Sequence, residues 1–76
     1  MNFRDERWLL DFGLNLKKIR EQQRFTQEKL AYASQLSLSQ IARTETGRVN
    51  PTLCTIVLIA KTLKVEPTEL FNLKFK

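Results

Sequence analysis

The side chains with chemical capacity in this sequence are hydroxyls, carboxamides and guanidinium groups, and they gather between Thr26 and Arg48. Such groups form hydrogen bonds but do not by themselves activate a nucleophile. The chain has no histidine to serve as a base, and its single cysteine, Cys54, can form neither an internal disulfide nor the usual type of zinc site. Two glycines and scattered carboxylates give neither a phosphate-cradling loop nor a metal site. We therefore predict a non-enzyme without metal, cofactor or small-molecule substrate.

The net charge of +5 is concentrated in the middle of the chain. Residues 1–13 have a net charge of −1, residues 14–48 have +4 and residues 49–76 have +2. The positive charge therefore lies where most of the hydrogen-bonding side chains lie. This distribution is typical of a polyanion binder, although an ordinary solvated basic surface would have the same composition.

The length of 76 residues fits one domain, and the apolar content of 42 % indicates a folded protein with a small core. No apolar run approaches the roughly 20 residues that a bilayer span needs. The N-terminus lacks the apolar stretch and small-residue cleavage site of a secretory signal. We expect a cytoplasmic protein without a membrane partner.

Two short helices joined by a tight turn are predicted between Thr26 and Arg48. Thr26 can cap the first helix, and Ser37 can cap the second, with Gln40 three residues later completing a capping box. Gly47 suits the end of the second helix. A helix pair of this size is suited to placing one helix in a groove of DNA.

The remaining elements also read as helices. An amphipathic stripe runs through Leu9, Phe12, Leu16 and Ile19. Gly13 within it costs about 1 kcal/mol relative to alanine, which leaves two alternatives: one helix from Glu6, or a helix from Leu14 behind a separate N-terminal turn.

Pro51 and Pro67 mark boundaries, since proline cannot extend a preceding helix and suits a first turn. The expected core face of the helix between them is Leu53, Ile56, Val57, Ala60 and Leu63. The predicted helices cover residues 6–23, 26–34, 37–46, 53–63 and 67–71. The fold class is therefore all-α: a compact five-helix domain over 1–76, with 1–11 as an N-terminal extension and 72–76 as a C-terminal tail.

Residues 12–71 resemble the Cro/cI (Xre) family of helix-turn-helix proteins, whose fold is that of the lambda-repressor-like DNA-binding domains. Several separate elements agree with that family in order and spacing. They are Ile19-Arg20, Thr26-Gln27, Leu30-Ala31, Ile41-Ala42-Arg43, Glu45 followed by Gly47-Arg48, Asn50-Pro51 and Glu69-Leu70-Phe71. The resemblance implies a partner, double-stranded DNA, with the helix at 37–46 lying in the major groove.

Helical geometry places Ile41, Thr44 and Glu45 on one side of that helix and Ser39, Ala42, Arg43 and Thr46 on the other. In the family, the outward side reads bases. The expected base-reading residues are Ser37, Leu38, Ser39, Gln40 and Arg43. The expected phosphate contacts are Gln27, Thr46, Arg48 and Asn50, with Lys17 and Arg24 as weaker candidates.

Four of these residues have alternative roles. Ser39 can bond to a base or to a phosphate. Arg43 can pair with the O6 and N7 atoms of guanine or hold a phosphate. Gln40 either reaches a base or turns back to cap its own helix. Leu38 either joins the core or contacts a thymine methyl group.

Arg20 and Glu45 match a family ion pair that joins the first helix to the recognition helix. Two positions depart from the family pattern. Thr44 replaces an aliphatic residue, and Gln35 stands where the turn often has glycine, so that its backbone is expected to be mildly strained.

Cys54 and Leu58 lie four residues apart on the side of the 53–63 helix that faces away from its predicted core stripe. Together with Leu73 and Phe75 they form the predicted dimer interface. The alternative is that Leu58 is a lone exposed leucine, which is common.

We therefore expect a homodimeric transcriptional regulator that binds a two-fold symmetric operator. A chain with little beyond this domain resembles restriction-modification controller proteins and phage-type repressors. The rival prediction is an antitoxin or protein-interaction module of the same fold, which would use an exposed Trp8 and the apolar tail.

Overall fold

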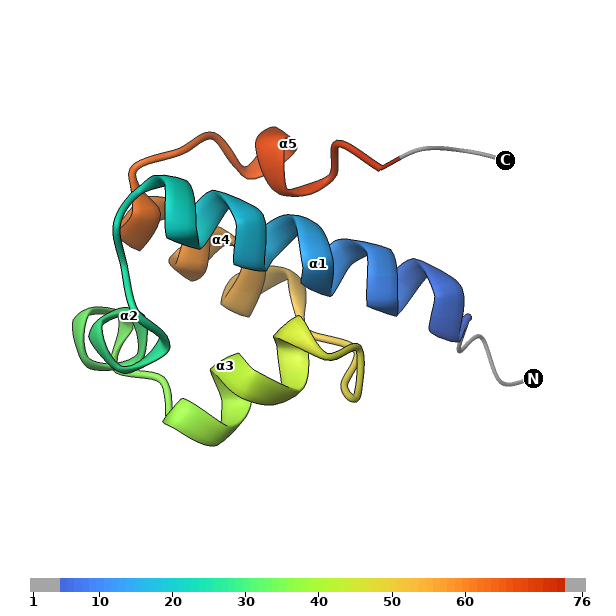
Figure 1. Ribbon diagram of the computed structural model, residues 1–76, viewed down its shortest axis with the longest axis horizontal. Helices are drawn as coiled ribbons and strands as arrows, with labels where there is room; N and C mark the ends of the chain where they lie inside the picture. Colours follow the sequence, from blue (N-terminus) through green and yellow to red (C-terminus); the bar gives the residue numbers. More distant parts are fainter. Residues whose placement is uncertain (1–4, 74–76) are drawn as a thin grey trace.

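The computed structural model describes residues 5–73 of the chain, and within that range it contains five helices and no strand. The helices are α1 (Glu6–Gln22), α2 (Gln27–Ser34), α3 (Leu38–Glu45), α4 (Leu53–Leu63) and α5 (Pro67–Leu70). The predicted all-α class and all five predicted helices are confirmed. Figure 1 shows α1 crossing the whole molecule, with α5 above it, α4 behind it and the α2–α3 pair below.

Four of the helices begin at a residue whose side chain caps the helix N-terminus. The side chains of Asp5, Thr26, Ser37 and Thr52 each accept a hydrogen bond from a backbone N–H of the following turn. These bonds satisfy donors that have no partner inside the helix. Pro67 lies in the first turn of α5, where its missing N–H costs nothing.

The long helix α1 is continuous through Gly13, so the alternative of a separate N-terminal turn is wrong. The glycine is explained by packing. A β-carbon built at Gly13 would lie 2.5 Å from the carbonyl oxygen of Thr44 and closer still to that of Glu45. The end of α3 thus rests directly on the backbone of α1. The turn after α3 also packs directly on the backbone of α1, because a β-carbon at Gly47 (φ 72°) would lie 2.9 Å from the backbone nitrogen of Leu10.

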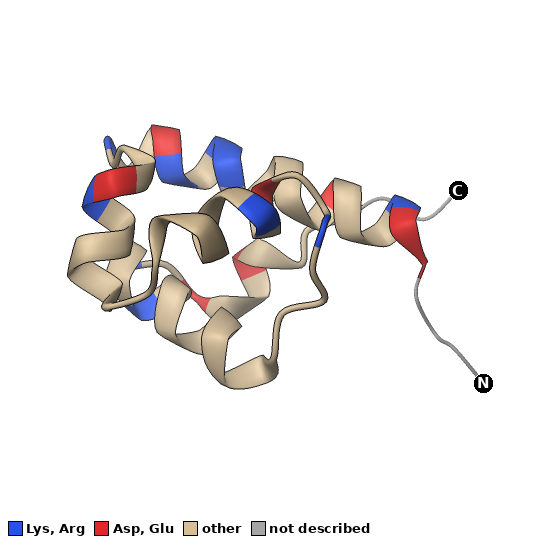
Figure 2. Ribbon diagram, turned by 90° about the horizontal axis from the view of Figure 1, so that it is seen from below, with Lys and Arg blue, Asp and Glu red and all other residues tan. Residues whose placement is uncertain are grey.

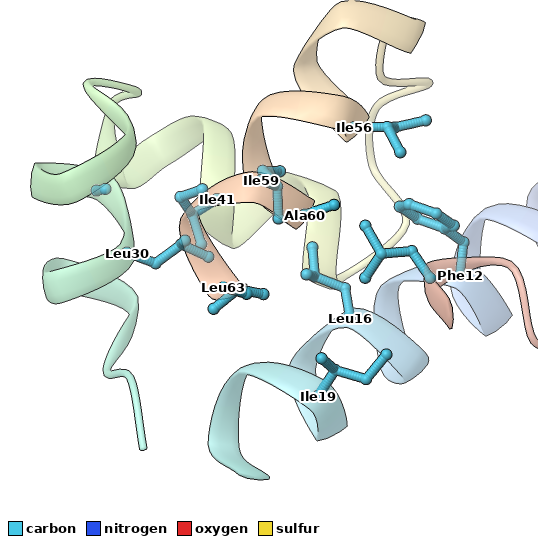
Figure 3. Packing of buried hydrophobic residues seen from close by; sticks show 11 residues of the cluster. Phe12, Leu16, Ile19, Leu30, Ile41, Ile56, Ile59, Ala60 and Leu63 are labelled. Atoms are coloured by element: carbon cyan, nitrogen blue, oxygen red, sulfur yellow. The ribbon is translucent and has the colours of Figure 1, made fainter. Parts of the chain in front are cut away.

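The hydrophobic core lies between α1 and the other helices (Figure 3). The largest side chains that are almost fully buried in it are Leu16, Leu30, Ile41, Ile59, Leu63 and Leu70. The predicted core face of α4 is partly wrong. Leu53 is 71 % exposed, Val57 is half-buried, and Ile59, which was not predicted, is buried. The core stripe of α4 is therefore rotated toward Ile56, Ile59, Ala60 and Leu63.

The turn between α2 and α3 passes through the left-handed backbone region at Gln35, with φ 62°. The expected strain at this position is confirmed, since a β-carbon makes that region unfavourable. The Gln35 and Leu36 N–H groups donate to the last carbonyls of α2. Leu36 packs against the core and fixes the angle at which α3 leaves the turn.

Candidate nucleic-acid interface

Helix α3 has one face on the protein and one face in solvent, as predicted. Ile41, Thr44 and Glu45 are buried. Thr44 is 4 % exposed, and its hydroxyl donates to the Gln40 carbonyl at 2.7 Å. The intrahelical bond explains how a polar residue is accommodated where the family has an aliphatic one.

The solvent face of α3 carries the predicted base-reading residues. Ser37, Ser39, Gln40 and Arg43 are exposed, and Leu38 is 45 % exposed, which favours the DNA-facing alternative for Leu38. Within the described residues, Arg43 forms no ion pair, so its guanidinium group is free to meet an incoming acceptor. Exposed polar groups at the start of a helix are the arrangement with which helix-turn-helix proteins contact base edges.

Gln40 caps its own helix. Its carboxamide oxygen accepts from the Ser37 N–H at 2.9 Å, and its backbone N–H donates to the Ser37 hydroxyl at 3.0 Å. This reciprocal box uses only the oxygen of the Gln40 carboxamide. The two NH₂ hydrogens remain, so capping and a base contact are compatible rather than exclusive.

A shallow groove of about 330 Å³ runs beside α3 toward the start of α4. Its polar lining includes Ser39, Arg43, Asn50, Thr52 and Thr55. Thr52 was predicted only as a helix cap, and Thr55 was not predicted to lie here. The fold brings the two threonines beside the base-reading face, because the loop after α3 turns back along that helix.

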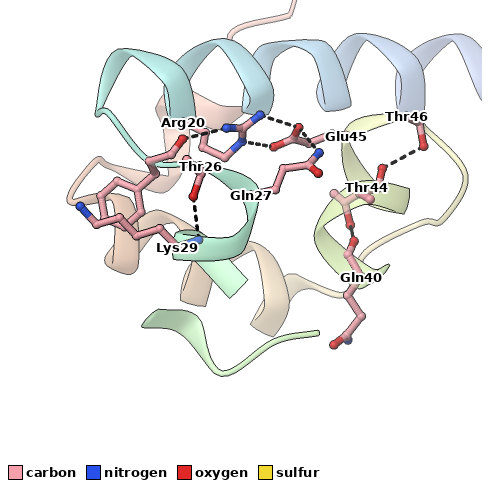
Figure 4. A network of polar contacts seen from close by, with 10 residues as sticks. Arg20, Thr26, Gln27, Lys29, Gln40, Thr44, Glu45 and Thr46 are labelled. Atoms are coloured by element: carbon pink, nitrogen blue, oxygen red, sulfur yellow. Dashed lines mark hydrogen bonds and ion pairs between the residues drawn. The ribbon is translucent and has the colours of Figure 1, made fainter. Parts of the chain in front are cut away.

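Arg20 and Glu45 form the expected ion pair, and it is buried (Figure 4). The Arg20 Nε atom donates to one oxygen of the Glu45 carboxylate at 2.5 Å, and Nη2 donates to the other at 3.0 Å. The remaining nitrogen, Nη1, donates to the Phe25 carbonyl at 2.7 Å. Hydrogen bonding to Glu45 raises the pKa of Arg20 above its ordinary value, against the opposing effect of burial. The pair holds α1, α3 and the start of α2 in one arrangement.

Gln27 joins this network, which the sequence analysis did not anticipate. Its Nε2 atom donates to Glu45 at 2.9 Å (Figure 4). The same carboxamide has a second N–H hydrogen, so contact with Glu45 leaves one donor for a phosphate. Gln27 thereby joins the buried ion pair to the side of the molecule where the phosphate contact is expected.

The other predicted phosphate contacts differ in their availability. Lys17, Arg24, Arg48 and Asn50 are exposed. Thr46 is exposed too, but its hydroxyl donates to the Ala42 carbonyl at 2.9 Å, so it has no proton left for a phosphate in this conformation. Figure 2 shows basic residues on α1, α2, α3 and the loop after α3, around the face that carries α3.

The predicted dimer residues lie in two different places. Cys54 and Leu58 are exposed on α4, beside the exposed Leu53. Leu73 is half-buried and packs against the core of its own chain, which removes part of its surface from any partner. Phe75 lies outside the described residues. The expectation of an exposed Trp8 is wrong, because its side chain is half-buried.

No group of three or more potential metal ligands occurs among residues 5–73. No helix in that part of the chain is long and apolar enough to cross a membrane.

Two capped helices, a fixed turn and a polar outward face on the second helix define a DNA-binding domain of the helix-turn-helix class. A profile of the helix-turn-helix family matches residues 16–70, and the chain belongs to that family. Its Cro/cI (Xre) resemblance is thus confirmed. The class of protein is that of DNA-binding regulators, and its members are not enzymes. No curated protein matches the sequence.

Solved structures support the same assignment. The restriction-modification controller protein C.AhdI from Aeromonas hydrophila is 38 % identical and aligns with a TM-score of 0.81, covering 83 % of this chain and 96 % of its own. The wild-type controller protein C.Esp1396I is 34 % identical, with a TM-score of 0.76 and coverages of 93 % and 88 %. The hypothetical transcription factor NHTF from Neisseria, at 24 % identity, has the same fold, with a TM-score of 0.82 over 96 % of this chain and 85 % of its own.

Proposed function

We propose that this protein is a homodimeric transcriptional regulator that binds a two-fold symmetric operator, and that it acts as a restriction-modification controller protein. The observation that carries the DNA-binding part is the outward face of α3, where Ser39 and Arg43 are exposed on a helix held by a buried ion pair. The controller assignment is supported by likeness to C.AhdI over nearly the whole of both chains.

In this proposal α3 lies in the major groove, and Arg43 pairs with a guanine. Gln27, Arg48 and Asn50 hold backbone phosphates on the two flanks of the groove. Lys17 and Arg24 add weaker contacts. Thr46 contributes only if its hydroxyl leaves the Ala42 carbonyl.

The dimer is supported by an apolar stripe on α4. Leu53 and Val57 are four residues apart, as are Cys54 and Leu58, so the four side chains share one side of the helix. Leu53 is 71 % exposed and Leu58 is 37 % exposed. A two-fold axis would pair this stripe with itself and would space the recognition helices about 34 Å apart, one turn of DNA.

Base reading and phosphate contact can be separated by two variants. Arg43→Ala should lose about 5- to 160-fold in affinity at one base pair per half-site and relax specificity there. Arg48→Ala should weaken binding to all sequences alike and lower the salt slope by about 1 for each half-site that the dimer contacts. Sites selected from a random DNA pool and titrations at several salt concentrations would measure both effects. A loss at one base pair only for Arg48→Ala would refute its phosphate role.

The single cysteine gives a direct test of the dimer. A short bismaleimide should join two chains through Cys54 at micromolar concentration, and Cys54→Ser should abolish the product. Leu58→Glu should lower dimerisation, since it places two like charges at the interface, whereas Leu14→Glu on α1 should not. A monomer mass by sedimentation, both free and with operator DNA, would overturn the dimer.

The rival function is an antitoxin or protein-interaction module. Steep salt dependence on DNA from upstream of its own gene would support regulation. Retention of a co-expressed neighbouring protein, with only weak and non-specific DNA binding, would support the rival instead.

A further inference from the structure

An apolar cavity of about 150 Å³ lies between the start of α1, the start of α4 and the residues after α5. None of the base-reading residues and none of the exposed stripe of α4 line it, although Asn50 and Pro51 line both this cavity and the groove beside α3. Its apolar walls are Trp8, Leu9, Phe12, Pro51, Ile56 and Phe71. An apolar cavity of about this volume accepts a benzene ring.

The cavity wall formed by the residues after α5 is partly exposed to solvent. Phe71 packs on Phe12 with ring centroids 5.3 Å apart, yet it is 48 % exposed. Leu73, the last described residue, also lines the cavity and is half-buried. The chain therefore runs along the rim of the cavity at Leu73.

The residues that follow fit this rim. The sequence from Phe71 to Lys76 alternates apolar and polar residues, with Phe75 two positions beyond Leu73. An extended segment places residues two apart on the same side and about 7 Å from each other. Phe75 is thus within reach of the cavity that Leu73 already lines.

Charge favours the same placement. Lys74 and Lys76 would lie on the solvent side of an extended tail. The start of α1 offers complementary charge, because Asp5, Glu6 and Asp11 outnumber Arg7 in that segment. Figure 2 shows acidic residues at this end of α1.

We propose that the C-terminal tail docks on its own chain, with the phenyl ring of Phe75 in the cavity between α1, α4 and Phe71. In the cavity, the docked ring contacts Pro51 and Asn50, which both line it. On the proposed function, Asn50 holds a phosphate, so the tail supports the loop that grips the DNA backbone. This last step rests on the proposed function, whereas the docking itself does not.

Trp8 is the only tryptophan and reports on the cavity. Phe75→Ala should shift its emission to longer wavelength and increase quenching by acrylamide, both measured on the full-length protein without DNA. Lys76→Ala in the same tail should leave both values unchanged. The exchange variant Lys74→Phe with Phe75→Lys keeps the composition but turns the ring away, and it should behave like Phe75→Ala. Unchanged Trp8 emission and quenching in Phe75→Ala would overturn the proposal.

Two further measurements test the same placement. Nuclear Overhauser contacts from the Phe75 ring to Trp8 and Ile56 should be present in the wild-type protein, and their absence would overturn the proposal. Trp8 quenching in the wild type should not change on dilution through the dimer range. Loss of protection on dilution would assign the cavity to the partner's tail and would also overturn intramolecular docking. Neither readout depends on DNA, so failure of docking and failure of the proposed function remain distinguishable.

Discussion

Helix propensity and packing predict opposite effects of the substitution Gly13→Ala on the free energy of unfolding. In a helix interior, Gly→Ala stabilises by about 1 kcal/mol. At Gly13 the added β-carbon would lie 2.5 Å from the Thr44 carbonyl oxygen and 2.7 Å from the Glu45 carbonyl carbon. Close carbon–oxygen contacts in proteins lie at about 3.3–3.6 Å, so α1 and the end of α3 would have to separate by nearly 1 Å.

The packing term should win. Overpacking costs about 1–3 kcal/mol, and both neighbours here are backbone atoms that cannot rotate away. Separation of the helices would also strain the short bonds between Arg20 and Glu45. Because the contacts are so short, we expect an overpacking cost at the upper end of that range, about 3 kcal/mol. After the propensity gain of about 1 kcal/mol is subtracted, Gly13→Ala should lower the free energy of unfolding by about 2 kcal/mol. For a chain of this length, total stability is only about 4–11 kcal/mol.

Thermal and urea unfolding would measure the change, which corresponds to a fall in Tm of about 4–8 °C per kcal/mol. Lys18→Ala, at an exposed position of the same helix, is the control and should stay within about 0.5 kcal/mol of the wild type. Gly13→Ala should also weaken operator binding, because α3 is displaced. An unchanged or raised Tm would refute the close approach of α1 and α3.

Three further experiments test contacts that hold the helices in place. Arg20→Ala and Glu45→Ala should each lower the free energy of unfolding by about 3–5 kcal/mol, since each leaves a buried charge without its partner. A double-mutant cycle with a coupling energy near zero would contradict the buried pair. Gln35→Gly should raise the midpoint of thermal unfolding, because glycine relieves about 1 kcal/mol of strain in the left-handed backbone conformation. The control Ala33→Gly, in the preceding helix, should lower the midpoint. Equal effects of the two substitutions would argue against strain at Gln35. Asn15→Ala should lower the free energy of unfolding in urea by about 1–3 kcal/mol, because the Asn15 side-chain amide donates to two carbonyls at the end of α5. An unchanged free energy of unfolding would show that these hydrogen bonds contribute nothing.

The helices were predictable because their signals are local. Thr26, Ser37 and Thr52 begin helices through hydrogen bonds to the next turn, and the sequence contains both partners of each bond. The inward side of α3 was equally predictable, since three buried positions follow from helical spacing alone.

The exact rotation of α4 was not predictable from its composition. Leu53, Val57, Leu58 and Ile59 are all apolar, so more than one face of this helix could have been the core face. Packing against α2 and α5 selects Ile59 and leaves Leu53 exposed. The sequence therefore indicated only Cys54 and Leu58 of the proposed dimer stripe, and the folded arrangement added Leu53 and Val57.

By itself, the sequence determined the class of fold, the order of its helices and the side chains that face outward on α3. These depend on spacings of three and four residues and on caps within one turn. Only the tertiary structure decided why a glycine stands at position 13 within α1, that Gln27 bonds Glu45, and that an apolar cavity opens beside Leu73. Each of these depends on groups 18 or more residues apart meeting in space, and packing of whole helices fixes such distances.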